Sequence, residues 1–169
     1  GPTDSYAVGD AVQAFGRNGG DEGLLLTDAA QNVRSDANFE RIDFAQAVDA
    51  LSFEVGDNGL MVSEGNTLLL TVPSLNNDVD VRFADGNVTV RQTGARTFEA
   101  EGADGSTQTI DAGAATLDVP LGSEISATAD GGSGGTDDVR SLGPNDDDSM
   151  LDATSGDLTF DFTGGDYAV

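Results

Sequence analysis

The pattern of apolar and polar positions changes near residue 51, and the two parts predict different elements. Before this point one group of apolar residues has the i, i+3, i+4, i+7 spacing of a helix face, with Thr27 or Asp28 available as a cap. This group is Leu26, Ala29, Ala30 and Val33. The next stretch, 38–51, is ambiguous: Phe44, Val48 and Leu51 share a helical face, but Phe39 and Ile42 fall off it. We expect one or two short N-terminal helices within about residues 20–51.

From Leu51 onward, short runs of strand-forming residues are separated by Gly, Asn and Asp at intervals of about 8–12 residues. This spacing is typical of an antiparallel β-sandwich or barrel. The predicted fold is therefore mainly β, an antiparallel sandwich or barrel-like domain preceded by the helical part. The β part covers about 51–129 and 150–163. The run TLLLTV at 67–72 lacks alternation, which predicts a central strand covered on both faces.

Glycine-containing turns set the register of four predicted hairpins. A two-residue turn is expected at Asp85-Gly86, at Asn58-Gly59 and at Ser155-Gly156, and a three-residue loop with Gly105 in the left-handed region is expected at 103–105. The predicted cross-strand pairs are Phe83 with Val88, Val81 with Val90, Asp80 with Arg91, Val55 with Val62, Phe98 with Ile110, Leu151 with Phe160, and Ala153 with Leu158.

We expect a single domain over 3–169, because the chain is long enough for one substantial core. Gly1-Pro2 matches the scar left when a 3C-type protease removes a purification tag, so we expect that the natural N-terminus was cut away, together with any anchor or signal that it carried. Residues 130–149 form a long acidic, Gly-rich stretch, which predicts a functional or mobile loop. No internal repeat stands out.

The charge changes the picture more than any motif does. The chain has 24 Asp and 7 Glu against 7 Arg and no Lys, which gives a formal charge of −24. Such a density of like charge destabilises a compact chain in dilute buffer, whereas at 1 M salt the screening length falls to about 3 Å. The excess of Asp, the absence of Lys and the many Ala, Val, Gly and Thr residues resemble the proteins of extremely halophilic archaea. This resemblance is compositional and implies a habitat.

A second interpretation of the charge stays open. An acidic secreted bacterial domain, such as a repeat of a calcium-loaded adhesin, would have its carboxylates neutralised by bound cations. We expect an extracellular or cell-surface location, with other protein subunits or cell-surface components as partners. Nucleic acid is not expected as a partner, because phosphate binding needs Lys and Arg. Membrane association is expected only through a segment outside this sequence, since no apolar run approaches about 18 residues.

The composition also excludes most catalytic chemistry. Without His, Cys or Lys the chain has no Ser-His-Asp or Cys-His arrangement and no Schiff-base amine. The GGSGG segment lacks the Lys-Ser/Thr of a phosphate-binding loop. A hydrolase with paired carboxylates is the remaining enzymatic alternative, but the chain has no Trp and only two Tyr for a sugar-binding cleft. We expect a protein that is not an enzyme and requires no cofactor.

Hard cations are the ligands that suit this composition, because calcium takes six to eight oxygen ligands. The best cluster lies in PNDDDSMLD, which lacks the Gly and the closing Glu of a calcium-binding loop. Its candidate calcium ligands are Asp146, Asp147, Asp148 and Asp152, with Asn145 beside them. A second, weaker set lies around the predicted hairpin: Asp78, Asp80 and Asp85. Asn87 begins the one glycosylation acceptor triplet, NVT.

Together these features predict a non-catalytic structural or adhesive module of the cell surface of a halophilic organism. The expected order of helix first and sheet after resembles the soluble part of a pilin-like, filament-forming subunit. A calcium-dependent ligand-binding or adhesin domain is the first alternative, and a carboxylate-pair hydrolase is the second.

Overall fold

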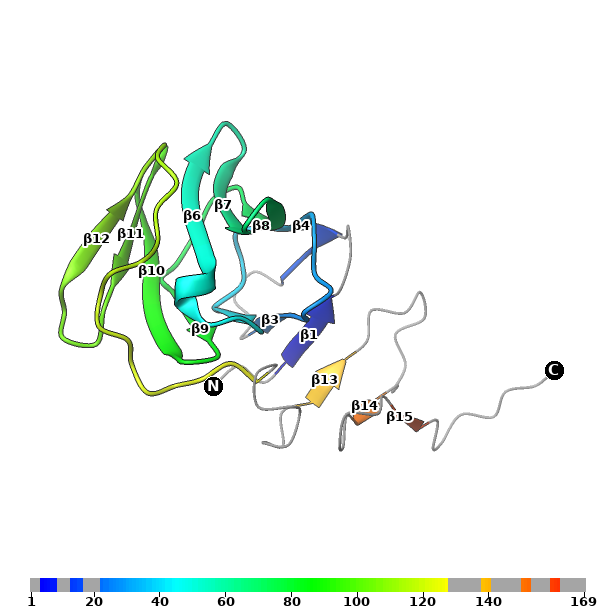
Figure 1. Ribbon diagram of the computed structural model, residues 1–169. Coiled ribbons are helices and arrows are strands. Elements are labelled where there is room, and N and C mark those ends of the chain that lie inside the picture. Colours follow the sequence, from blue (N-terminus) through cyan, green and yellow to red (C-terminus); the bar gives the residue numbers. More distant parts are fainter. Residues whose placement is uncertain are drawn as a thin grey trace.

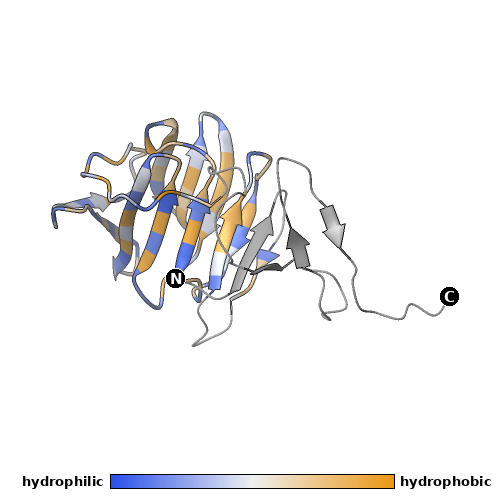
Figure 2. Ribbon diagram, turned by 90° about the horizontal axis from the view of Figure 1, so that it is seen from below, coloured by the Kyte–Doolittle hydropathy of each residue, from blue (hydrophilic) through white to orange (hydrophobic). Residues whose placement is uncertain are grey.

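The structure is a computed structural model, and it describes residues 4–8, 13–16, 22–127, 138–140, 150–152 and 159–161 (Figure 1). The described part of the chain is mainly β, as predicted, with two mixed sheets. The larger sheet has the strand order β12-β11-β10-β9-β5-β3-β1-β13-β14-β15, and the smaller has the order β2-β4-β8-β7-β6. Apolar and polar residues alternate along many of these strands (Figure 2), and the apolar sides of the two sheets form a common core.

The strands have the following bounds. Those of the larger sheet are β1 (Asp4–Val8), β3 (Glu22–Leu26), β5 (Arg41–Phe44), β9 (Val79–Phe83), β10 (Gly86–Gly94), β11 (Thr97–Glu101), β12 (Thr107–Ile110), β13 (Asp138–Arg140), β14 (Met150–Asp152) and β15 (Thr159–Asp161). Those of the smaller sheet are β2 (Gln13–Ala14), β4 (Val33–Ser35), β6 (Leu51–Gly56), β7 (Gly59–Glu64) and β8 (Thr67–Val72).

The N-terminal part winds between the two sheets in parallel coils. Successive strands alternate from the larger sheet to the smaller, and each pairs in parallel with the strand one coil earlier: β1 with β3, β3 with β5 and β5 with β9 in one sheet, and β2 with β4 and β4 with β8 in the other. The offset from β1 to β3 is 18 residues, as in Asp4 opposite Glu22, and it is 18 again from Gly23 to Arg41. The hairpin β6–β7 is inserted into the third coil before β8 takes its place beside β4.

This winding shows a repeat that we did not find in the sequence. Three segments repeat at the 18-residue offset: VGDAVQAF (8–15), LTDAAQNV (26–33) and FAQAVDAL (44–51). Each begins and ends with an apolar residue and has a small residue second, a polar residue third and sixth, and Ala fourth. The fifth residue is Val or Ala, and the seventh varies. The similarity lies in residue class and not identity, which is why it is easily missed. In the second and third segments it marks the corner where the coil passes from the larger sheet to the smaller.

The predicted N-terminal helices are wrong for the described residues. Residues 22–51 contain β3, β4, β5 and one 3-10 turn, η1 (Val48–Ala50). Leu26, Ala30 and Val33 are all buried, but they do not share a helix. Leu26 is the end of β3, Ala30 lies in the corner, and Val33 is the start of β4. A corner that turns between two facing sheets therefore reproduces the helical spacing. Ala29, which a helix would also bury, is exposed.

Polar side chains join consecutive coils at the opposite corner. The Asp36 carboxylate accepts hydrogen bonds from the backbone N–H of Gly16 at 3.1 Å and of Asn38 at 3.0 Å. The Asn38 amide donates to Asp36 at 3.0 Å, and its oxygen accepts from the Asn76 amide at 3.0 Å. The bonds from Gly16 to Asp36 and from Asn76 to Asn38 link residues 20 and 38 positions apart and hold the three corners in line.

Within the two mixed sheets, β6 to β8 and β9 to β12 pair antiparallel with one another, as predicted for the part after Leu51. β8 is the central strand of the smaller sheet, with Leu69–Val72 buried. Two of the predicted registers are confirmed: Phe98 pairs with Ile110, with Gly105 at φ +80°, and Leu151 pairs with Phe160. The Ala153–Leu158 pair lies outside the described residues.

The other two registers are wrong by two residues. Phe83 pairs with Gly86 and Val81 with Val88, because the turn residues are Ala84 and Asp85. Val55 pairs with Leu60, because the turn residues are Asp57 and Asn58. In both hairpins the Gly follows the turn and opens the returning strand. A shift of two preserves which side each residue faces, so the predicted apolar face is still correct.

The core lies between the sheets and contains the largest buried side chains: Phe44, Phe53, Phe83 and Phe98. Phe44 and Phe83 occupy the ends of neighbouring strands and stack with centroids 5.9 Å apart, and Phe53 of the smaller sheet meets Phe83 edge-on at 6.1 Å. These contacts tie the two sheets together, since aromatic pairs add about 0.5–1.5 kcal/mol beyond area burial.

Residues 111–127, which we call the strap, run from β12 along the edge of the sandwich (Figure 1). The strap first pairs with the edge strand β6, through mutual backbone bonds between Phe53 and Ala115 of 2.8 and 3.0 Å. It then crosses the ends of β10, β9 and β5: Gly122 donates to Asn87, Ser126 to Phe83, and Ala127 to the Asp43 carboxylate. A backbone edge that would otherwise be open to pairing is thereby covered.

Of the long stretch 130–149, only the strand β13 lies among the described residues, and it pairs in parallel with β1. No helix among the described residues is long and apolar enough to cross a membrane.

Candidate functional site

The face of the larger sheet that points away from the core carries a network of ion pairs, which we call the charged face. It is built from Arg41, Asp43, Asp78, Asp80, Arg82, Arg91, Glu99, Glu101 and Glu124. The register alternates the charges, since Arg41 lies opposite Asp80 and Asp43 opposite Arg82. Opposite charges facing each other across strands stabilise a sheet by roughly 0.2–1 kcal/mol per pair.

The pair Arg41–Asp43 is the buried end of the charged face. Both side chains are almost fully buried, with Arg41 Nε 2.5 Å from Asp43 Oδ2 and Arg41 Nη2 3.2 Å from Oδ1. The strap covers this pair, because the Ala127 N–H donates to Asp43 Oδ1 at 3.1 Å. A buried carboxylate with three donors is a satisfied structural group.

Arg91 is the exposed end of the charged face and is shared by three carboxylates. It donates a hydrogen bond to Glu101 and lies 3.9 Å from both Asp78 and Glu99. The hydrogen bond to Glu101 is the largest cause that raises the pKa of Arg91, followed by the opposing effect of burial and the favourable charges of Glu101, Asp78 and Glu99. This guanidinium is permanently charged and holds β9, β10 and β11 together.

The weaker metal candidates Asp78, Asp80 and Asp85 do not converge on one point. Asp80 accepts from Arg82 at 2.6 Å and from the Asn87 amide at 2.8 Å. Asp85 accepts from the Val48 N–H at 3.0 Å and so ties the β9–β10 turn to η1. The predicted opposition of Asp80 and Arg91 is replaced by Asp80 opposite Thr89. Among the described residues no group of three or more acidic side chains could hold a metal ion.

The first calcium candidates lie elsewhere. Asp146, Asp147 and Asp148 fall outside the described residues. Asp152 is the last residue of β14. Calcium binding by these residues therefore stays a prediction.

Asn87, the predicted glycan acceptor, is half-buried and fully engaged. Its amide nitrogen, where a glycan would be attached, donates to Asp80, and its oxygen accepts from the Glu124 N–H at 3.2 Å. Attachment of a sugar would therefore disturb the hydrogen bond from β10 to Asp80 of β9.

Other carboxylates act locally, by accepting backbone N–H groups in loops. Asp104 accepts from both the N–H and the hydroxyl of Ser106, at 2.9 and 2.6 Å. These two bonds, the hydroxyl first, hold the pKa of Asp104 below its usual value. Asp111 accepts from the Gly113 N–H at 3.0 Å. Asp suits this use because its short side chain closes a turn onto the backbone two residues on.

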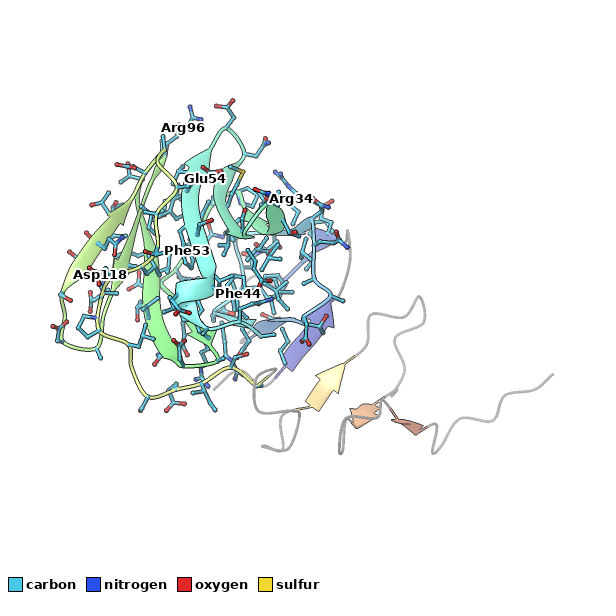
Figure 3. All side chains as sticks on the ribbon, viewed as in Figure 1. Arg34, Phe44, Phe53, Glu54, Arg96 and Asp118 are labelled. Atoms are coloured by element: carbon cyan, nitrogen blue, oxygen red, sulfur yellow. The ribbon has the colours of Figure 1, made fainter. Side chains whose placement is uncertain are left out.

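One hollow of about 370 Å³ lies at the end of the two sheets. The β6–β7 turn (56–59), Pro73 after β8, and Ala95 and Arg96 between β10 and β11 form its walls, and Arg34 of β4 also lines it. Both arginines line the hollow, and in Figure 3 Arg96 and Arg34 lie above the labelled Phe44 and Phe53. Arg96 donates to Asp57, and both side chains are largely exposed. Tight backbone packing shapes the wall, since a Cβ on Gly59 would overlap the Val72 carbonyl oxygen.

Sequence reasoning did not identify this hollow. Its residues come from four separate segments, and none belongs to a motif. The one indication in the sequence was the scarcity of cations: with only 7 Arg in 169 residues, each arginine was a candidate for a specific role. A comparison with protein-family models, curated proteins and solved structures finds no match to this chain.

Proposed function

We propose that this protein is a non-catalytic structural or adhesive module that works outside the cell, or on its surface, in concentrated salt. The observation that supports this most is the use of its arginines. Residues 22–127 contain 18 acidic residues and five arginines. Four of the five are bound by carboxylates: Arg41, Arg82 and Arg91 in the charged face, and Arg96 at the hollow.

The internal ion pairs engage four of the five arginines in residues 22–127 and leave most carboxylates to solvent and dissolved ions. Such a surface repels itself in dilute buffer and is relieved by screening in brine. Beneath this surface, the coils, the corner bonds and the strap connect distant parts of the chain. A frame connected in this way, with a strongly hydrated acidic surface, suits a structural or adhesive role in a salty exterior.

Two of the alternatives raised by the sequence lose support. The resemblance to a pilin-like subunit rested on a helix before the sheet, and residues 22–51 form parallel strands instead. A carboxylate-pair hydrolase needs two close carboxylates in a cavity, whereas the hollow is lined by one carboxylate, Asp57, and two arginines.

Antibody labelling of intact cells that produce the protein tests the proposed location. We expect the label on intact cells without permeabilisation, and release of the antigen by mild protease treatment of whole cells. Labelling that appears only after lysis would contradict a surface role. A cytoplasmic protein with the same salt adaptation serves as the control for leakage.

A further inference from the structure

We propose that the hollow lined by Arg34 and Arg96 binds a hydroxylated carboxylate of the uronic-acid type, that is, an acidic sugar. This assignment goes beyond the structural role and is tested separately from it. It begins with the position of the cations. Two of the five arginines in residues 22–127 line the same hollow, on a protein body that otherwise carries many more acids than bases.

Arg34 is the exception among these five arginines. Within the described part of the chain it has no carboxylate at ion-pair distance, whereas Arg41, Arg82, Arg91 and Arg96 each have at least one. Its neighbours across the strands are neutral, Gln13 on one side and Thr71 on the other. An exposed guanidinium that no described carboxylate binds, in a chain so rich in acids, has its donors available for a ligand.

The chemistry of a guanidinium selects the anion. Its planar array of N–H donors matches a carboxylate or a phosphate through two parallel hydrogen bonds. Repulsion from the surrounding acids grows with the charge of the ligand, so the singly charged carboxylate is favoured over the doubly charged phosphate. Concentrated salt weakens the attraction between exposed charges by screening, whereas it weakens short, directional hydrogen bonds of this kind less.

The rest of the lining favours hydroxyl groups beside the carboxylate. Asp57 and Asn58, on the tip of the β6–β7 turn, offer oxygens that accept hydrogen bonds, and Asn58 and Arg96 offer donors. Val55, Pro73 and Ala95 provide small apolar surfaces for the C–H face of a ring. A hollow of about 370 Å³ lies at the lower end of the range of small-molecule sites, about 300–1,000 Å³, which suits one or two sugar rings.

Titration of the isotope-labelled protein, followed by NMR in a salt concentration that keeps it folded, tests the assignment. Potassium glucuronate is the probe, and glucose, acetate, inorganic phosphate and the peptide PNDDDSMLD are the comparisons. We expect glucuronate to shift the backbone signals of 56–59 and 94–97 and to bind about tenfold more tightly than glucose or acetate. Tighter binding of phosphate or the acidic peptide would overturn the assignment and identify a phosphate or peptide site instead. Equal binding of glucose would show that the carboxylate is not recognised.

Substitutions of the arginines provide the second part of the test. Arg34→Gln removes the charge and the donors from an exposed position, and we expect glucuronate affinity to fall at least tenfold with an unchanged circular dichroism spectrum. Arg34→Lys keeps the charge without the planar donors and should bind at an intermediate level, while Arg96→Gln should weaken binding severalfold. Asp104→Asn, which lies on a turn outside the hollow, is the control and should bind like the wild type. Unchanged affinity in both Arg34 variants would overturn the proposal.

Discussion

At the scale of single residues, the abundance of Asp has two causes: hydration of the surface, and the use of Asp side chains to bind backbone N–H groups. Asp36, Asp85, Asp104 and Asp111 accept backbone N–H groups and hold corners and turns in place. Asp36, Asp104 and Asp111 bond the N–H two residues on, closing a ring that a longer Glu side chain would close less well, whereas Asp85 bonds the distant Val48. The preference for Asp over Glu thus reflects local geometry as well as hydration, and a cluster of Asp letters in the sequence is not by itself a metal site.

The Asp104 turn provides a direct test of this use. Ser106→Ala removes the hydroxyl that contributes most to the lowered pKa of Asp104, so we expect this pKa to rise toward its usual value. NMR titration of the Asp104 carboxyl measures the change. A carboxyl whose pKa is depressed in the folded state adds stability above its unfolded pKa and loses that contribution as the pH falls through the folded value. The variant should therefore show a weaker dependence of stability on pH in the acidic range.

Ser106→Thr is the matched control, because it retains the hydroxyl and should retain the lowered pKa. If Ser106→Ala leaves the titration of Asp104 unchanged, the hydroxyl does not stabilise the carboxylate.

At the scale of elements, the sequence predicts strands better than it predicts their arrangement. Alternation identified most strands after Leu51, and turn residues located the four predicted hairpins but not those between β7 and β8 and between β10 and β11. The parallel coils were missed because a corner between two sheets buries Leu26, Ala30 and Val33 at helical spacing. A corner differs from a helix in that its flanking strands pair with strands one coil away. These paired strands are 18 or more residues apart in the sequence, so a local pattern does not reveal them.

The same limit applies to the two hairpin registers that were wrong. A Gly after a turn and a Gly within a turn look alike in the sequence, and both registers keep the apolar residues on the same side. The hollow could not be predicted at all, because it depends on where four separate segments meet.

Gly59 tests the packing of the β6–β7 turn against Pro73. It has φ +113°, and a Cβ there would overlap the Val72 carbonyl, so Gly59→Ala should destabilise the protein. Gly65→Ala is the matched control, since Gly65 also has a positive φ of +57° but has no atom within 4 Å of the methyl group that alanine would add. We expect the control to lose about 1 kcal/mol and Gly59→Ala to lose about 1–3 kcal/mol more, measured by chemical denaturation. Equal losses would mean that the steric contact is unimportant.

The strap has its own glycine pair. A Cβ on Gly122 would overlap the Asn87 side chain, whereas a Cβ on Gly113 would lie at an ordinary 3.6 Å from Asp111. Gly122→Ala should cost about 1–3 kcal/mol and increase hydrogen exchange at Gly122 and Ser126, and Gly113→Ala should change stability by less than about 0.5 kcal/mol. A strap that exchanges at the same rate in both variants would not be held by its contact with β10.

At the scale of the whole molecule, one feature organises the described surface: four of the five arginines in residues 22–127 form ion pairs, and most acidic side chains have no arginine beside them. The charged face uses three arginines to join β5, β9, β10 and β11, and the hollow takes the other two of residues 22–127. Composition alone reveals the excess of acids but not this division, because ion-pair partners come from strands brought together by the fold. Screening of the remaining carboxylates should then govern the stability of the entire protein.

Thermal unfolding followed by circular dichroism tests this dependence in three buffers: low salt with EDTA, low salt with millimolar calcium, and about 2–3 M KCl with EDTA. We expect only the concentrated KCl to raise the Tm, by about 10 °C or more, which corresponds to roughly 3–5 kcal/mol for a chain of this size. An equal rise with millimolar calcium at low salt would contradict a surface adapted to bulk salt and show that specific cation sites neutralise the carboxylates. A Tm that is the same in all three buffers would show that the acidic surface does not limit stability at all.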